Sequence, residues 1–168
     1  MEFRKAVKSD LPELNRVFSK IVRDLDSRNI HVWDEEYPFC SFPEDIEKGG
    51  LYVLFDKDKL VSAFAIYREN ISAPYVDWQD NNAKALYVER LGVNIGYYRQ
   101  GIANFMMDKA ADLVREAGFE YLRLFVAEIN LPAIAFYKKA GFVFADGVYI
   151  DEIGDTPLPE LGMEKKIV

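Results

Sequence analysis

Strand-like and helix-like segments alternate along the whole chain, and no low-complexity linker separates them. Such an alternation favours helices that pack on the faces of one mixed sheet. The chain has 168 residues, and a globular domain contains roughly 100–200 residues. We therefore expect a single domain over residues 1–168 with an α/β (α+β) fold.

The periodicity of the apolar residues locates the individual elements. Apolar runs predict strands at residues 3–7, 51–55, 60–67, 85–93, 121–126, 142–148 and 162–168. Apolar positions at helical spacing and capping residues predict helices at residues 11–25, 43–46, 102–117 and 130–140. Residues 29–42 and 68–84 remain irregular and rich in aromatic side chains. Loops as long as the second of these segments are usually functional or mobile.

The composition excludes several functional classes. The 28 acidic and 21 basic residues give a net charge of -7, whereas a nucleic-acid binder needs a basic face. No apolar run approaches the roughly 20 residues of a membrane span, and we find no signal segment. A single cysteine, Cys40, fits a reducing compartment, and a single histidine, His31, argues against a metal site. We expect a cytoplasmic protein without metal, nucleic-acid partner or membrane partner.

A strand–turn–helix stretch is the most informative part of the sequence. The strand at residues 85–93 leads through a turn to Gly101 and to the start of an amphipathic helix. The free N–H groups of a helix start suit a phosphate, and the small residues Gly101 and Ala103 would let it approach the backbone. Neither of the common glycine-rich phosphate motifs is present. Taken alone, this glycine is a weak signal, and an ordinary turn is the preferred interpretation.

A second block strengthens the phosphate interpretation. It runs from Asn130 to Phe142 and contains Asn, then Ala-x-x-x-Tyr, then Gly-Phe. The two blocks, in this order and spacing, resemble the GNAT superfamily of acyl-CoA-dependent N-acetyltransferases. The resemblance implies a mixed, mostly antiparallel central sheet of about six to seven strands with about four flanking helices. The first block departs from the family pattern, because Tyr98 stands where Gln or Arg is usual and the basic residue is Arg99.

The resemblance also implies which residues hold acetyl-CoA. Main-chain groups of residues 91–93 would pair with the pantetheine arm like an added strand, and the amides of residues 98–104 would hold the pyrophosphate. Asn130 would bond the pantetheine arm, and Tyr137 would lie near the thioester sulfur and protonate the leaving thiolate. The implied cofactor-binding residues are Leu91, Gly92, Val93, Tyr98, Arg99, Gln100, Gly101, Ile102, Ala103, Asn104, Asn130 and Tyr137. As alternatives, Asn130 is simply a helix N-cap and Tyr137 a core residue.

Glu89 is the candidate general base. Strict strand alternation would place Glu89 on one face with Tyr87, Leu91 and Val93. A carboxylate among apolar neighbours can accept a proton near neutral pH, and a protonated amine must lose one before it attacks. A main-chain N–H at Leu91 or nearby would stabilise the oxyanion. The alternatives for Glu89 are an ion pair with a basic neighbour and plain solvation.

The acceptor site should come from the segments that the cofactor motifs leave over. Trp33, Tyr37 and Trp78 lie in the two irregular segments among carboxylates, a mixture that suits a cationic amine. The alternative is that these aromatic side chains only attach the irregular segments to the core.

The preferred hypothesis is an enzyme that moves the acetyl group of acetyl-CoA to a primary amine by direct attack in a ternary complex. Its acceptor would be a small-molecule or peptide amine, and the family resemblance leaves room for a homodimer. A non-catalytic module of the same fold that binds or senses acyl-CoA is the alternative. A protein without any ligand would require both motif blocks to be coincidences.

Overall fold

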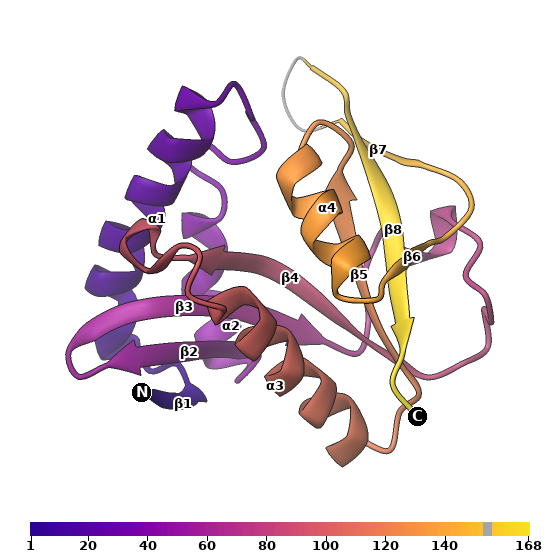
Figure 1. Ribbon diagram of the computed structural model, residues 1–168, viewed down its shortest axis with the longest axis horizontal. Coiled ribbons are helices and arrows are strands. Elements are labelled where there is room, and N and C mark those ends of the chain that lie inside the picture. The colour runs from indigo at the N-terminus through magenta and orange to yellow at the C-terminus, as the bar shows by residue number, and fades with distance from the viewer. Residues whose placement is uncertain (153–155) are drawn as a thin grey trace. The chain divides into compact units, whose positions relative to one another are not determined.

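The computed structural model describes residues 1–152 and 156–168. Contacts divide the chain into two compact units that interleave in sequence (Figure 1). Unit 1 comprises Met1–Ile66 and Glu89–Asp108, and unit 2 comprises Tyr67–Val88 and Lys109–Val168. Strand β4 (Ala85–Val93) and helix α3 (Ile102–Glu116) therefore each contribute residues to both units.

Unit 1 combines an antiparallel sheet with two helices. Its further elements are strands β1 (Glu2–Lys5), β2 (Leu51–Asp56) and β3 (Lys59–Tyr67) and helices α1 (Leu11–Ser27) and α2 (Phe42–Glu47). Strand β2 pairs with β1 and with β3, and the β2–β3 hairpin closes where Asp56 pairs with Lys59. The strands expected at residues 51–55 and 60–67 are thus both present, as neighbours in one hairpin.

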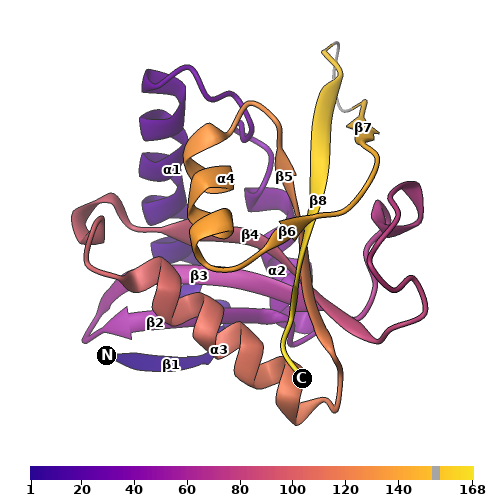
Figure 2. The same ribbon diagram turned by 45° about the vertical axis from the view of Figure 1, so that its right-hand side comes forward.

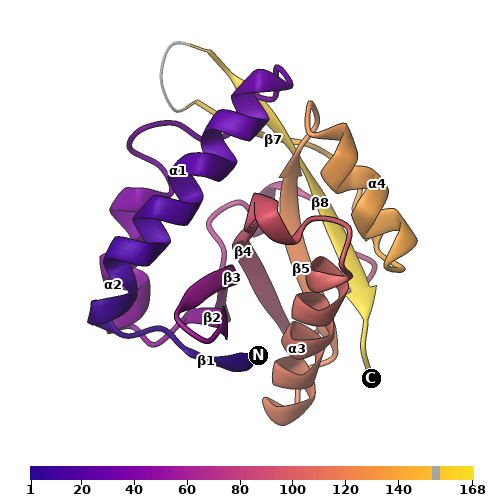
Figure 3. The ribbon, with the colours of Figure 1, turned by 60° about the vertical axis from the view of Figure 1, so that its left-hand side comes forward.

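Helix α1 packs its apolar face on the sheet of unit 1 (Figure 3). The buried face consists of Leu14, Val17, Phe18, Ile21, Val22 and Leu25. These positions recur at the spacing of one helix face. Proline is tolerated at position 12 because an N–H in the first turn of a helix would have no intrahelical acceptor. The Phe18 ring meets the ring of Phe42 edge-on at 4.9 Å, which joins α1 to α2.

The close approach of α1 to β4 requires a glycine at position 92. A Cβ atom built on Gly92 would lie 2.6 Å from Cζ of Phe18 and 3.1 Å from Cδ1 of Ile21. Phe18 has no exposed surface, so its ring cannot turn away without displacing other core residues.

Replacing Gly92 by alanine is therefore expected to destabilise the protein by about 1–3 kcal/mol through overpacking. Gly96→Ala is the matched control, because its Cβ would meet only Oδ1 of Asn94, at 3.6 Å. Both variants stiffen the unfolded chain equally, so their difference in the free energy of unfolding in urea isolates the clash. Equal stabilities would contradict the packing argument.

Unit 2 contains four further strands and one further helix. Its elements are strands β5 (Tyr121–Ala127), β6 (Val143–Phe144), β7 (Tyr149–Asp151) and β8 (Leu158–Lys166) and helix α4 (Leu131–Lys139). The first half of β4 pairs with β5 in parallel, from Ala85 with Tyr121 to Val88 with Leu124. Strand β8 pairs antiparallel with β5, β6 and β7. Helix α4 runs beside β5 (Figure 2).

The fold class is confirmed. The described residues form an eight-stranded sheet in the order β1-β2-β3-β4-β5-β8-β6, with β7 also on β8, and four α-helices. Short 3-10 helices occupy Lys8–Asp10, Phe39–Ser41, Ala73–Tyr75 and Ile95–Tyr97.

Two element predictions near the C-terminus were wrong. The single strand expected at residues 142–148 is instead the two-residue β6 followed by a separate β7, because the chain turns at Gly147, where φ is +98°. A residue with a Cβ atom rarely adopts such a φ. Strand β8 begins at Leu158, earlier than the predicted residue 162.

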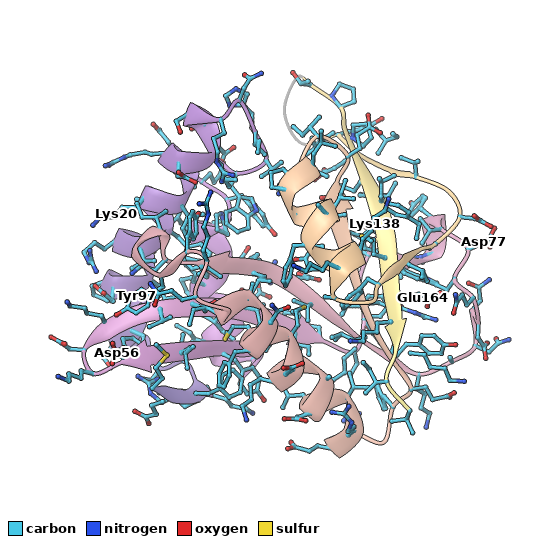
Figure 4. The ribbon with its side chains drawn as sticks, viewed as in Figure 1. Lys20, Asp56, Asp77, Tyr97, Lys138 and Glu164 are labelled. Atoms are coloured by element: carbon cyan, nitrogen blue, oxygen red, sulfur yellow. The ribbon has the colours of Figure 1, made fainter. Side chains whose placement is uncertain are left out.

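A buried ion pair holds the long segment at residues 68–84 on unit 2. Nε of Arg123 donates to Oε2 of Glu164 at 3.1 Å, and neither side chain exceeds 2% exposure. Both groups also bind the segment: Arg123 Nη2 donates to the Asp80 carbonyl at 2.7 Å, and Glu164 Oε1 accepts from the Gln79 N–H at 2.6 Å. Figure 4 labels Glu164 on β8 and Asp77 on the segment. The segment is therefore built into the fold.

In the part of the chain that the structure describes, no helix is both long enough and apolar enough to cross a bilayer.

Candidate active site

Along the second half of β4, successive residues direct their main-chain N–H and C=O groups to opposite edges of the strand. The Gly92 carbonyl accepts from Ser62 Oγ at 2.7 Å, and the Asn94 N–H donates to the Val61 carbonyl at 2.8 Å. Both contacts are with β3, so the groups of Leu91 and Val93 point to the opposite edge. The pantetheine pairing predicted for residues 91–93 therefore falls to Leu91 and Val93, while the Gly92 carbonyl is already used within unit 1.

The turn after β4 is anchored at several points of unit 1. Asn94 accepts from the Gly96 N–H through Oδ1 and donates through Nδ2 to the Leu60 carbonyl at 2.8 Å. Tyr97 Oη donates to Oδ2 of Asp56 at 3.2 Å, and Figure 4 labels both residues. These hydrogen bonds fix the backbone conformation of the turn that leads to α3.

Tyr98 provides a further anchor, to helix α1. Its hydroxyl donates to Oδ2 of Asp24 at 3.3 Å. Burial, followed by the Asp24 charge, raises the pKa of Tyr98 to about 12, so this phenol keeps its proton at neutral pH. The side chain that replaces the usual Gln or Arg thus binds α1, and any phosphate contact at position 98 has to come from its backbone.

The backbone before α3 has the geometry of an anion-binding loop. Arg99 and Gly101 both adopt left-handed conformations, with φ of +61° and +77°. Left-handed residues within a turn direct successive N–H groups toward one side. Helix α3 begins at Ile102, and its first N–H groups have no intrahelical acceptor. Apart from its chain neighbours, no described residue has an atom within 4 Å of the position of a Cβ on Gly101, so the predicted pyrophosphate would have room to approach.

The structure corrects the expected surroundings of Glu89. Oε2 of Glu89 accepts from Nη1 of Arg90 at 2.7 Å, so its neighbour is a guanidinium and not an apolar wall. Neighbouring residues of a regular strand point to opposite faces, but Arg90 has a φ of +55°. This left-handed residue interrupts the alternation, so Glu89 forms an ion pair, and the prediction of apolar surroundings for its carboxylate was wrong.

Arg90 also gathers residues from the irregular segment and α2. It forms a two-pronged ion pair with Asp45, at 2.8 and 2.9 Å, and donates to the Tyr37 hydroxyl at 3.2 Å. Sequence patterns missed Arg90 and Asp45, since 45 residues separate them and no motif links them. Tyr37 therefore contacts Arg90, the residue that also pairs with Glu89.

The two tryptophans support the packing alternative. Trp78 is buried in the core of unit 2 with Tyr87 and Tyr121, and its indole N–H donates to the Ala73 carbonyl. Trp33 lies on Phe18, with a ring-centre distance of 5.7 Å. Burial removes Trp78 from the set of surface groups that could bind an acceptor.

Unit 2 carries Asn130 and Tyr137 on the two ends of α4. Oδ1 of Asn130 accepts from the Ala133 N–H at 3.3 Å, so Asn130 is the N-cap of this helix. Its Nδ2 has no partner among the described residues and remains able to donate to a ligand. Both interpretations of Asn130 are therefore compatible.

Tyr137 is buried between aromatic rings but its hydroxyl is not enclosed. The ring packs on Phe136 and Phe142 at centre distances of 5.2 and 5.6 Å. The hydroxyl has no hydrogen bond within the described chain, where no fully buried side-chain oxygen lacks a partner, so the oxygen must reach the surface. Burial raises the pKa of Tyr137 well above its ordinary value. This combination gives a neutral phenol with a free proton.

No group of three or more His, Cys, Asp or Glu side chains among residues 1–152 and 156–168 is arranged to hold a metal ion.

Comparison with known proteins places this architecture in a family. The family model of the acetyltransferase (GNAT) family matches residues 18–142. The chain belongs to the GNAT family. The GNAT match covers both motif blocks, from the strand–turn–helix stretch to Phe142.

Solved structures agree with this GNAT fold. A GNAT-family acetyltransferase from Streptococcus agalactiae has a TM-score of 0.81 at 15% identity, over 98% of this chain and 94% of that one. The ribosomal-protein-S18-alanine N-acetyltransferase from Escherichia coli has a TM-score of 0.68 at 17% identity, over 99% and 93%. At these identities the likeness concerns the fold alone.

One curated relative is similar over a shorter stretch. Streptothricin acetyltransferase from Streptomyces lavendulae is 41% identical over 59 residues, which are 35% of this chain and 31% of the relative. The match thus spans about a third of each protein.

Proposed function

We propose that this GNAT protein is an N-acetyltransferase that moves the acetyl group of acetyl-CoA to a primary amine by direct attack in a ternary complex. The observation that carries the proposal is Tyr137, a neutral phenol on α4 whose hydroxyl has no partner in the described chain. A module that only bound acyl-CoA would have no use for a proton donor at this position. We further propose that residues 1–168 work as one catalytic domain.

The chain's own groups would share the work as follows. The N–H groups from Tyr98 to Asn104, led by the left-handed Arg99 and Gly101, hold the pyrophosphate, and Arg99 adds positive charge. Leu91 and Val93 pair with the pantetheine arm, and Asn130 donates to it through Nδ2. When bound, acetyl-CoA supplies an activated thioester.

The amine nitrogen attacks the thioester carbonyl, and Glu89 takes up its proton directly or through water. The Leu91 N–H stabilises the developing oxyanion. Tyr137 then gives its proton to the thiolate as the carbon–sulfur bond breaks. An uncharged amide and free CoA are the products.

We propose a small-molecule or peptide amine as the acceptor. The match to streptothricin acetyltransferase adds streptothricin to the candidate acceptors. Tyr37 is the aromatic side chain best placed to contact such an amine, through the cluster that it shares with Arg90 and Glu89. The proposal also includes a cytoplasmic location, homodimerisation, and no nucleic-acid or membrane partner.

Glu89→Gln is expected to lower kcat about tenfold near pH 6 and less above pH 8. The loss shrinks as the pH rises because the fraction of free amine, which needs no base, increases. The affinity for acetyl-CoA should not change. Stopped-time assays of thiol release across this pH range check the prediction, and an unchanged pH–rate profile would remove Glu89 from the mechanism.

Binding is tested first, by thermal unfolding with acetyl-CoA. Acetyl-CoA at about 100 times its dissociation constant should stabilise the protein by about 2.7 kcal/mol. Acetylpantetheine, which lacks the pyrophosphate, should stabilise it much less at the same concentration. No shift with millimolar acetyl-CoA would refute both the enzyme and the binding module, whereas a shift without thiol release to any amine would favour the module.

A further inference from the structure

Arg90 is a buried cation that donates hydrogen bonds to two sets of partners. Its Nε and Nη2 donate to the two carboxylate oxygens of Asp45 at 2.9 and 2.8 Å, and both side chains are nearly inaccessible, at 8% and 5% exposure. Its Nη1 donates to Glu89 at 2.7 Å and to the Tyr37 hydroxyl at 3.2 Å. Glu89 retains 23% exposure, so it is the carboxylate of this cluster that a ligand can reach more easily.

The planar guanidinium transmits orientation from Asp45 to Glu89. Two parallel hydrogen bonds to one carboxylate fix the plane of an arginine side chain. Once Asp45 fixes this plane, the direction of Nη1 is fixed as well. Asp45 belongs to α2 and is itself 4% exposed, so the cluster is anchored on a buried side chain of this helix.

The contact between the side chains of Glu89 and Arg90 depends on a strained backbone conformation at Arg90. A left-handed conformation in a residue with a side chain is strained and persists only when its surroundings require it. At Arg90 this φ, +55°, brings two adjacent side chains into contact that a regular strand would send to opposite faces. The strain therefore lies at the residue next to the proposed base.

Two further charged side chains lie on α2 and at its C-cap, Glu44 and Lys48. They form their own ion pair at 2.6 Å, and the hydrogen bond from Lys48, with the Arg90 charge as the weakest cause, lowers the pKa of Glu44. Both are exposed and paired with each other, so neither replaces Asp45 as the partner of Arg90.

We infer that Arg90 is a positioning residue for acetyl transfer: with its guanidinium fixed on Asp45, it holds the Glu89 carboxylate in one orientation. The inference rests on the proposed function, because it gives Glu89 the role of proton acceptor. Arg90 itself need not touch acetyl-CoA or the amine. Its contribution should therefore appear in kcat and vanish when Glu89 can no longer act.

The test replaces the buried pair as a unit. Arg90→Met with Asp45→Leu removes both charges of the nearly inaccessible pair, and such replacements are often neutral for stability. Glu89, which is 23% exposed, loses its cation but keeps its carboxylate. The double variant is expected to bind acetyl-CoA with unchanged affinity and to lose roughly fivefold in kcat, as a misplaced catalytic group does. Arg90→Lys, which keeps the charge but not the two-pronged geometry, is the second variant and should lose about threefold.

Each change is then repeated in the Glu89→Gln background. If Arg90 acts through Glu89, its replacement costs nothing further there. A full additional loss in that background, or wild-type kcat in both Arg90 variants with Glu89 present, would overturn the inference and leave the proposed function standing. Wild-type activity of Glu89→Gln alone would refute the base assignment and the inference with it, whereas loss of acetyl-CoA binding in the wild type would refute the proposed function directly.

Discussion

Tyr137→Phe is expected to lower kcat by about 10²–10⁴-fold, the usual contribution of a positioned general acid. Phenylalanine keeps the ring contacts with Phe136 and Phe142 and removes only the hydroxyl. The variant should therefore fold normally and bind acetyl-CoA as the wild type does. Rates of thiol release at saturating acetyl-CoA, together with the dissociation constant, separate the two effects.

The pH dependence adds a second criterion for the same residue. Burial raises the pKa of Tyr137, so the protonated form that acts as an acid persists from neutral pH to well above pH 9. No alkaline loss of kcat should arise from Tyr137 below that pH. Tyr121→Phe is the matched control, since Tyr121 is also buried in unit 2 and also lacks a hydroxyl hydrogen bond in the described chain. Equal activity of the two variants would contradict the assignment.

Arg123→Met is expected to have the largest effect on stability, about 3–5 kcal/mol, because it leaves a buried carboxylate without its cation. Glu164 has no exposed surface and would keep only the Gln79 N–H as a donor. The Asp80 carbonyl would also lose its partner, which should loosen the segment at residues 68–84. Urea unfolding measures the loss, and hydrogen exchange of the segment locates it.

An exposed ion pair of the same unit is the control for this variant. Arg115 and Asp112 pair on α3 at 2.9 Å with more than half of each side chain exposed. Arg115→Met should change the free energy of unfolding by no more than about 1 kcal/mol, the usual range of surface pairs. A loss as small as this in Arg123→Met would mean that the buried pair does not hold the segment.

Elements with strong periodicity could be predicted from the sequence. Helix α1 begins where the apolar spacing and the first-turn proline place it, and β4 has the predicted bounds of residues 85–93. The break between β6 and β7 was missed because the apolar residues on both sides of Asp146-Gly147 predict one strand by their pattern, although this dipeptide is typical of a turn.

The cofactor loop and the tyrosine were predictable, but their surroundings were not. Glycine and a helix start locate the loop, whereas the Tyr98–Asp24 bond joins residues 74 positions apart and has no local signal. Strand alternation also misled the description of Glu89, since it assumes a regular backbone through Arg90. Long-range ion pairs and single strained residues determine the surroundings of these side chains, and the periodicity of the sequence does not reveal them.

Acetyl transfer itself is the most direct test of the account. The protein is incubated with acetyl-CoA and a panel of amines that contains streptothricin, a linear polyamine and a peptide with N-terminal alanine, and thiol release is followed with the product mass. We predict that at least one amine gains a single acetyl group, with one CoA thiol released per acetamide, and that Tyr137→Phe abolishes most of this turnover. Acetyl-CoA binding without an acetylated amine, or acetylation unaffected by Tyr137→Phe, would contradict it.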